Sequence, residues 1–163
     1  MTITPAHAEP ARPARPGAFV GRGHAPARDA EFVDLQDAYR RSGGIARGES
    51  LAQRMSQTHP GGYVDLARRI VGGQLFSFQW YDDFWLPLFQ FDPVRLVPRE
   101  APRRVLAELR GALDGWALAH WFVTPQRRLD ERLPLEVLDS DLPAVLAAAR
   151  GARIDSQRSA WSA

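Results

Sequence analysis

Three segments in the first half of the chain carry apolar residues at helical spacing. The first begins at Asp29 and is ended by the glycines of RRSGG. We expect a second helix over residues 48–56, which THPGG ends, and a third over residues 63–71. The apolar positions that define these helices are Phe32, Val33, Leu35 and Tyr39, then Leu51, Ala52 and Met55, then Tyr63, Leu66, Ala67 and Ile70.

The next segment, GGQLFSFQWYDDFWLPLFQFDP, alternates between two faces as strands do. This pattern predicts an antiparallel hairpin that turns at Asp82 and Asp83. Pro87 favours an edge position for the second strand, because proline donates no hydrogen bond to a neighbour. Since apolar residues occupy both faces, we expect either the C-terminal helices or a second chain to cover them. The apolar hairpin residues are Phe76, Phe78, Trp80, Trp85, Phe89 and Phe91.

Helical spacing returns after Pro93. APRRVLAELRGAL aligns Val105, Leu106, Leu109 and Leu113 on one face. The stretch WALAHWFVTP, residues 116–125, is apolar nearly all round, which predicts a central helix that begins after a capping Asp114 and ends before Pro125. We expect a short helix over residues 134–138 and a last helix over residues 141–152, whereas the last ten residues show no packing pattern.

These elements predict a mainly α fold: N-terminal helix-turn-helix-like helices with one β-hairpin wing, then a small C-terminal helical bundle. The expected organisation is a disordered arm over residues 1–28, a winged helix-turn-helix-like region over 29–93, a helical domain over 94–153 and a C-terminal tail over 154–163. The arm is assigned by its composition, because Pro, Ala, Gly and Arg offer almost nothing that could form a core.

Composition narrows the function classes. The 163 residues include no cysteine, which excludes disulfides, thiolate metal sites and cysteine nucleophiles. No apolar run reaches the length of a membrane helix, and the N-terminus lacks the apolar centre of a signal peptide. We therefore expect a soluble cytoplasmic protein. The formal net charge of +2 says little about nucleic acid by itself.

Catalytic signals are weak. The four histidines, at positions 7, 24, 59 and 120, form no pair with metal-ligand spacing. The glycine doublets do not continue as phosphate-binding loops, and no serine lies in a nucleophile motif. Asp82 and Asp83 are explained by the turn that contains them. We expect neither an enzyme, nor a metal, nor a cofactor.

DNA binding is left open by the order of the helices. In a helix-turn-helix the second helix of the pair enters the major groove with polar and basic side chains. That helix offers Arg68 and Arg69, but its Asp65 would repel phosphate. The candidate DNA-binding residues are Arg40, Arg41, Arg47, Arg54, Arg68 and Arg69, and a solvated face explains them equally well.

A series of motifs runs through the C-terminal half. An aromatic helix is followed by a Pro-x-x-x-Leu turn, by a short helix that begins with proline and by a last helix with small residues. The positions concerned are Trp116, Ala119, Trp121 and Phe122, then Pro125 and Leu129, then Pro134 and Leu138, then Leu142, Val145 and Ala148 or Ala149. In order and spacing these motifs resemble the toxin-binding domain of the Xre/MbcA/ParS antitoxins.

The resemblance extends upstream, because the hairpin with its P-x-FQFD ending is similar to a hairpin found in a subgroup of that family. It then covers roughly residues 43–155. Two positions depart from the family pattern: Gln126 replaces an asparagine, and the residues DER at 130–132 replace a glycine. Glutamate tolerates left-handed backbone conformations less well than glycine, so Glu131 bears directly on the shape of the turn.

The resemblance implies a protein that binds a RES-type toxin, an NAD-consuming enzyme, and covers its active-site entrance with the C-terminal segment. The N-terminal region would dimerise or bind the operon's promoter, so a protein toxin, operator DNA and a homo-oligomer are the expected partners, with no membrane. The toxin-binding residues implied are Trp116, Trp121, Phe122, Pro125, Gln126, Leu129, Pro134, Leu138, Arg150, Arg153, Arg158 and Trp161. The alternative is a stand-alone DNA-binding or scaffold protein that has this fold and no toxin.

Overall fold

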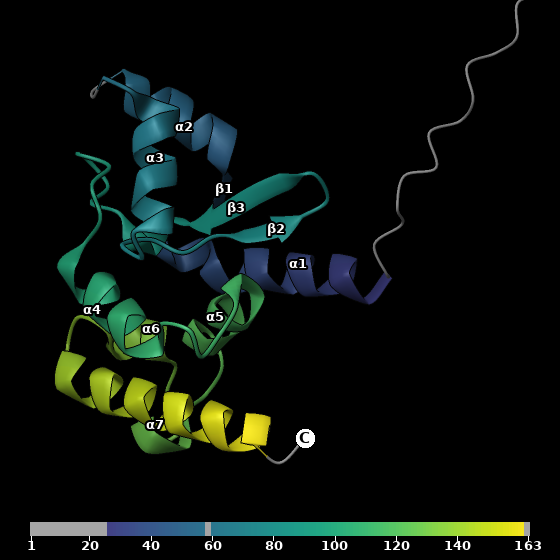
Figure 1. The fold of residues 1–163 in the computed structure, drawn as a ribbon, viewed down its shortest axis with the longest axis vertical. Helices are drawn as coiled ribbons and strands as arrows, with labels where there is room; N and C mark the ends of the chain where they lie inside the picture. The colour runs from purple at the N-terminus through teal and green to yellow at the C-terminus, as the bar shows by residue number, and fades with distance from the viewer. Residues whose placement is uncertain (1–25, 58–59, 162–163) are drawn as a thin grey trace, which may run out of the picture.

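The computed structural model describes residues 26–57 and 60–161 (Figure 1). Its α-helices are α1 (Pro26–Tyr39), α2 (Gly48–Ser56), α3 (Gly62–Val71), α4 (Glu100–Leu109), α5 (Gly115–Phe122), α6 (Pro134–Val137) and α7 (Leu142–Trp161). The strands are β1 (Ile45–Arg47), β2 (Phe78–Trp80) and β3 (Asp83–Pro87), and short 3-10 helices are η1 (Arg40–Ser42), η2 (Leu88–Gln90) and η3 (Arg127–Leu129). The expected mainly α fold with one hairpin wing is confirmed. Most of the expected arm lies outside the described residues, although α1 already begins at Pro26.

The three strands form one antiparallel sheet in the order β1-β3-β2. A helix, a strand, two helices and a hairpin follow one another, which is the order of a winged helix-turn-helix. The hairpin turns at Tyr81 and Asp82 rather than at Asp82 and Asp83, and Tyr81 takes a left-handed backbone conformation with φ 53°. Strand β1 is not predicted by any periodicity, because three residues are too few to show one.

The expected edge position of Pro87 is wrong, since β3 is the central strand of the sheet. Pro87 is the last residue of β3 and pairs with Ile45. The next donor along the chain, the N–H of Leu88, bonds to the carbonyl oxygen of Gly44 at 2.9 Å. Proline is tolerated here because the strand ends at this position and turns into η2.

The sheet is covered on both faces by helices of the same chain (Figure 1). Phe84 and Leu86 belong to a cluster with α2 and α3, whereas Trp85, the residue between them, packs with α1 and the C-terminal helices. This alternation is the period of two that a strand imposes. The cover predicted for the hairpin is therefore supplied within the described chain.

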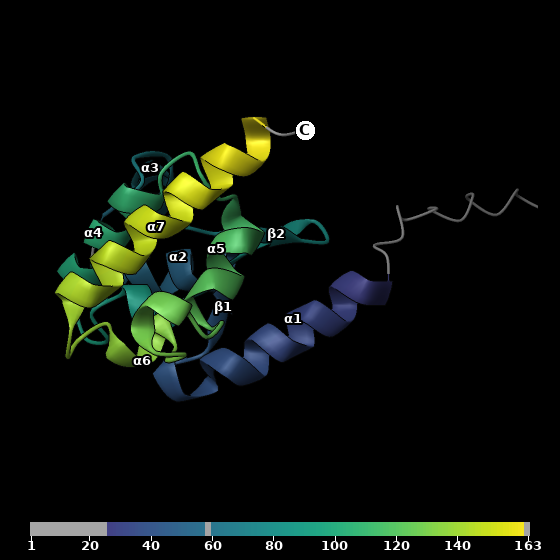
Figure 2. The same cartoon turned by 90° about the horizontal axis from the view of Figure 1, so that it is seen from below.

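Helix α1 lies on the opposite face of the sheet from α2 and α3 (Figures 1 and 2). Phe32 stacks on the Trp80 ring with 3.8 Å between ring centroids. Tyr39 is fully buried and donates a hydrogen bond of 2.7 Å to the carbonyl oxygen of Ala119 in α5. Gly43, with φ 102°, then lets the chain leave the helix. Helix α1 thus packs with the C-terminal helices rather than with α2 and α3.

The segment LFQFD, residues 88–92, forms hydrogen bonds that hold the chain on either side of the hairpin in place. The buried Gln90 side chain accepts a hydrogen bond from the N–H of Phe76 and donates to the carbonyl oxygens of Phe76 and Pro87. Asp92 accepts hydrogen bonds from the N–H groups of Arg95 and Val94, which lower the pKa of its carboxyl group. Both polar residues of this motif are accounted for by backbone hydrogen bonds.

The aromatic helix α5 begins as predicted, with the Asp114 carboxylate accepting a hydrogen bond of 2.8 Å from the N–H of Ala117. Gly115 is required there, because a Cβ at this residue would lie 2.0 Å from the carbonyl oxygen of Ser77. The helix packs against β2 on one side and α6 on another, as expected for a central helix. Ala119, Trp121 and Phe122 are its buried residues.

Three expectations on the helices are wrong. Val33, expected among the apolar positions of the first helix, is 55% exposed. Tyr63 is 57% exposed instead of facing inward, and Leu66 is the fully buried residue of α3. Helix α7 extends to Trp161, past the expected end at residue 152. Polar contacts hold this extension, since Ser156 donates a hydrogen bond to the carbonyl oxygen of Ala112 and Asp155 pairs with Arg128. A search for apolar stripes does not detect such anchors.

Burial raises the pKa of the Tyr39 hydroxyl above its ordinary value of 10.0. Stability that depends on the neutral hydroxyl is therefore complete below about pH 10 and declines above it, because the unfolded chain ionises first. We expect Tyr39→Phe to be about 1 kcal/mol less stable than the wild type at pH 8, through loss of a buried hydrogen bond. The difference should disappear near pH 11, since the wild type loses about 1.4 kcal/mol per pH unit.

Urea unfolding of both proteins at a series of pH values measures this crossing. Tyr63→Phe is the matched control, because it removes an exposed hydroxyl and should leave stability within about 0.5 kcal/mol of the wild type. A constant deficit of Tyr39→Phe from pH 8 to pH 11 contradicts the assignment.

Candidate functional site

Most of the hydrophobic residues of the resemblance lie in the core. Trp121 is 7% exposed, while Phe122, Leu129 and Leu138 are at most 1% exposed. Pro134 is buried at the start of α6. The other four side chains belong to one core cluster with residues of α7. They shape the domain and are too buried to form an exposed contact surface.

Trp116 is half-buried and joins α5 to the hairpin. Its indole N–H donates a hydrogen bond of 2.8 Å to the carbonyl oxygen of Gln79, and its ring contacts that of Phe78. The Arg28 guanidinium lies 4.7 Å from the ring centroid, which is cation–π distance. Trp116 therefore links three elements of the chain instead of projecting from its surface.

The turn from Pro125 to Arg132 closes on itself. Gln126 and Arg132 form an isolated antiparallel bridge, and the N–H of Glu131 bonds to the carbonyl oxygen of Gln126 at 3.1 Å. Asp130 and Glu131 both take left-handed conformations, with φ 55° and 61°. Glu131 thus adopts the backbone conformation that favours glycine, at the place where the family pattern has glycine, at a cost of about 1–2 kcal/mol.

This turn and the C-terminal half of α7 enclose a groove of about 480 Å³, called here the α7 groove. Pro125 and Gln126 line it from one side and α7 from the other. Its apolar floor contains Leu113, Ala148 and Ala152. The remaining lining residues are polar: Arg127, Arg128, Asp155, Ser156 and Ser159. The groove brings together residues that are more than 20 positions apart in the sequence.

Arg128 lies across the inner part of the groove. Its guanidinium pairs with Asp155 at 3.3 Å and covers the backbone of Gly151, where a Cβ would approach the Arg128 Nε to 2.4 Å. A glycine inside a helix costs about 0.5–1 kcal/mol, and the close approach of Arg128 explains its presence. The neighbouring Arg127 is exposed and has no ion pair within the described residues.

The C-terminal arginines are directed elsewhere. Arg150 and Arg153 both contact the Glu108 carboxylate on α4, at 3.0 and 3.8 Å. Neither lines the α7 groove, and Arg158 is exposed farther along α7. The backbone of Trp161 ends the helix, while its side chain lies outside the described residues. Pro125 and Gln126 therefore share the groove with one face of α7, whereas Arg150 and Arg153 lie on another face of the same helix.

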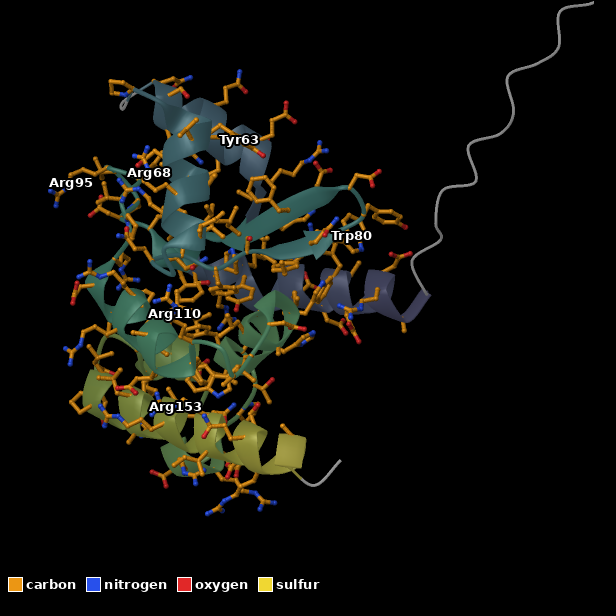
Figure 3. The ribbon with its side chains drawn as sticks, viewed as in Figure 1. Tyr63, Arg68, Trp80, Arg95, Arg110 and Arg153 are labelled. Carbon is orange, nitrogen blue, oxygen red and sulfur yellow. The ribbon has the colours of Figure 1, made fainter. Side chains whose placement is uncertain are left out.

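The candidate DNA-binding arginines do not form one surface. Arg40 pairs with Asp37, Arg47 with Asp83, and Arg69 with Asp65 at 2.8 Å. Arg41, Arg54 and Arg68 have no ion pair within residues 26–57 and 60–161. In Figure 3 Arg68 projects from α3 toward the same edge of the view as Arg95, whereas Arg153 lies on the distant α7.

The outward face of α3 is largely apolar. Val64 is 61% exposed and Val71 84% exposed, and both lie on the helical face that also carries Arg68. The recognition helix of a DNA-binding protein presents polar and basic side chains instead. Arg68 is therefore the cation of α3 that is open to a phosphate, since Arg69 is held by Asp65.

The described residues contain no group of three or more His, Asp or Glu placed to hold a metal ion. His120 is half-buried in α5, where its ring lies 6.2 Å from that of Trp116. Nor do these residues include a helix long and apolar enough to cross a membrane. The other three histidines, His7, His24 and His59, lie outside the described residues.

Sequence reasoning missed Arg127, Arg128, Gly151 and most of the α7 lining. A signal for the lining exists: Ala148, Ala152, Ser156 and Ser159 are small residues at spacings of four and three, which places them on one helical face. The pattern is recognisable only if the helix continues past residue 152.

No protein-family model, no curated protein and no solved structure matches this chain.

The left-handed conformation of Glu131 yields a stability prediction. We expect Glu131→Gly to raise the free energy of unfolding by about 0.5–1 kcal/mol, because glycine avoids the left-handed penalty at a smaller cost in chain entropy. Glu131→Ala removes the same charge but keeps a Cβ, so it should change stability by less than about 0.5 kcal/mol. Urea unfolding compares the three proteins. An equal gain from both variants would assign the effect to charge instead of backbone strain.

Proposed function

We propose that this chain is an antitoxin whose C-terminal helices bind a protein toxin of the RES type through the α7 groove. The observation that supports this proposal is the groove itself, which unites Pro125 and Gln126 of the resembling turn with the exposed half of α7. A hollow between a strained turn and a helix suits the insertion of a segment from a partner.

The groove lining indicates what such a segment would contain. Leu113, Ala148 and Ala152 offer a shallow apolar floor, while the Gln126 amide and the hydroxyls of Ser156 and Ser159 offer hydrogen bonds. The exposed Arg127 favours an acidic residue in the partner. Occlusion of a toxin needs no catalytic residue in the inhibitor, only a fitted surface with a buried centre.

The choice of a RES-type toxin rests on the resemblance of the C-terminal motifs, which run in the family's order. Glu131 supports it, because its left-handed conformation reproduces what a glycine would provide in the turn. The nature of the partner then follows: an NAD-consuming enzyme whose active-site entrance is covered when the antitoxin binds.

We expect a RES-type gene beside this one, and co-expression of the two genes tests the proposal. The wild type should relieve growth arrest and preserve cellular NAD. Ser159→Trp places a large ring at the groove and should weaken toxin binding at least tenfold, measured by calorimetry with purified proteins. Gln157→Trp is the matched control, because Gln157 is equally exposed on α7 but lies about half a turn away, outside the groove.

Equal loss of binding in both variants contradicts the α7 groove as the binding surface. Unrelieved growth arrest with the wild type contradicts the antitoxin function, as does the absence of a RES-type gene beside this one. Circular dichroism of each variant establishes that the helices are retained before binding is compared.

A second candidate function, promoter binding, is favoured by the winged helix-turn-helix order of the elements. We expect retardation of the DNA upstream of this gene at low salt, with a steep salt dependence. Arg68→Ala should weaken binding and reduce the slope of log K against log salt by about one. Arg104→Ala, at an exposed arginine of α4 outside the helix-turn-helix-like region, is its control. Absence of retardation at low salt contradicts this function.

A further inference from the structure

A second hollow, of about 550 Å³, lies where α2, η2 and α6 approach one another. It is called here the junction slot. Its lining joins Arg54 of α2, on one side of the sheet in Figure 1, to Leu135 of α6, on the other side. Its volume lies in the range of about 300–1,000 Å³ that is typical of small-molecule sites. It shares no lining residue with the α7 groove.

The walls of the junction slot are mainly hydrocarbon. Its apolar side chains come from η2, from the segment after η2 and from α6 with the residue directly after it: Leu88, Phe89, Phe91, Pro93, Leu96, Leu135 and Leu138. Leu88 and Leu135 are only partly buried by the described residues. An apolar molecule in the slot would remove the exposed surface of Leu88 and Leu135 from water, which favours its binding.

Charge in the slot is unbalanced. Asp139, the acidic residue of the lining, already pairs with Arg99, which also donates a hydrogen bond of 3.0 Å to the carbonyl oxygen of Phe89. Arg54, on the last turn of α2, has no ion pair within the described residues. With Arg99 and Asp139 paired to each other, the Arg54 guanidinium is the charged group of the lining that can receive an anion, at the α2 end of the slot.

We propose that the junction slot binds an aliphatic carboxylate of medium chain length, a ligand that does not depend on the toxin partner. Its carboxylate accepts hydrogen bonds from the Arg54 guanidinium, whose planar fork matches two carboxylate oxygens. Its hydrocarbon chain runs along η2 toward Leu135 on α6 and Leu138 directly after it. Such a ligand contacts both the helix-turn-helix part and the C-terminal helices, so its binding stabilises the whole chain by mass action.

Calorimetry with the full-length protein tests this proposal, with sodium decanoate as the probe. We expect one decanoate per chain with a micromolar dissociation constant, and a rise in melting temperature that follows ligand concentration. Decanol has the same chain without the charge and should bind at least tenfold more weakly, because it cannot form the charged hydrogen bonds to Arg54. Decyltrimethylammonium carries the opposite charge and should not bind.

Two variants place the ligand in the slot. Arg54→Gln should weaken decanoate binding about tenfold while leaving decanol binding unchanged. Arg104→Gln, at an exposed arginine of α4 that does not line the slot, is the matched control and should bind decanoate as the wild type does. Leu135→Trp fills the slot and should abolish binding of both ligands.

The proposal is overturned if the wild type does not bind decanoate at millimolar concentration, or if decanol binds as tightly. Equal weakening by Arg54→Gln and Arg104→Gln shows general attraction to positive charge and also overturns it. The comparison of the two arginine variants needs no buried substitution, so it decides the proposal even if Leu135→Trp does not fold.

Discussion

A three-stranded sheet with apolar side chains on both faces is the constraint on which this fold depends. Its central strand directs Phe84 and Leu86 to one side and Trp85 to the other. Because a short sheet cannot cover itself, helices must lie on both faces. Helices α2 and α3 cover one face, and α1 with the C-terminal helices covers the other. The position of α7, outermost in this second layer, follows from that arrangement (Figure 2).

Apolar burial drives these layers together, but polar side chains fix how they meet. The Gln90 side chain bonds to both the N–H and the carbonyl oxygen of Phe76. These two hydrogen bonds set the position of the chain where it enters the hairpin. Tyr39 fixes α1 on α5, and Arg99 ties η2 to α6 through its contact with Asp139. Each contact joins segments that burial alone would allow to slide, because burial is not directional whereas a hydrogen bond is.

The sequence predicts those parts of the fold that show a periodic apolar pattern or a local feature such as a helix cap. The bounds of α2, residues 48–56, and the Asp114 cap of α5 are both correct, since an apolar stripe and a capping carboxylate act within one turn. Strand β1 and the end of α7 depend on partners distant in the sequence. The candidate site divides in the same way: motifs indicate Pro125 and Gln126, while the contact of Arg128 with Gly151 exists only in the folded chain.

The aromatic motif therefore acts on the α7 groove through the shape of the domain. Trp121 and Phe122 anchor α5, and the buried Leu129 anchors the turn that follows it. With Phe122 buried before the turn and Leu129 buried within it, Asp130 and Glu131 remain left-handed in spite of the energetic cost, because relaxing them would pull Leu129 from the core. The strained turn then presents Pro125 and Gln126 opposite α7 at a fixed separation. A binding surface that depends on buried residues in this way can keep its shape while its exposed residues change, so the motif describes the scaffold more closely than the contact.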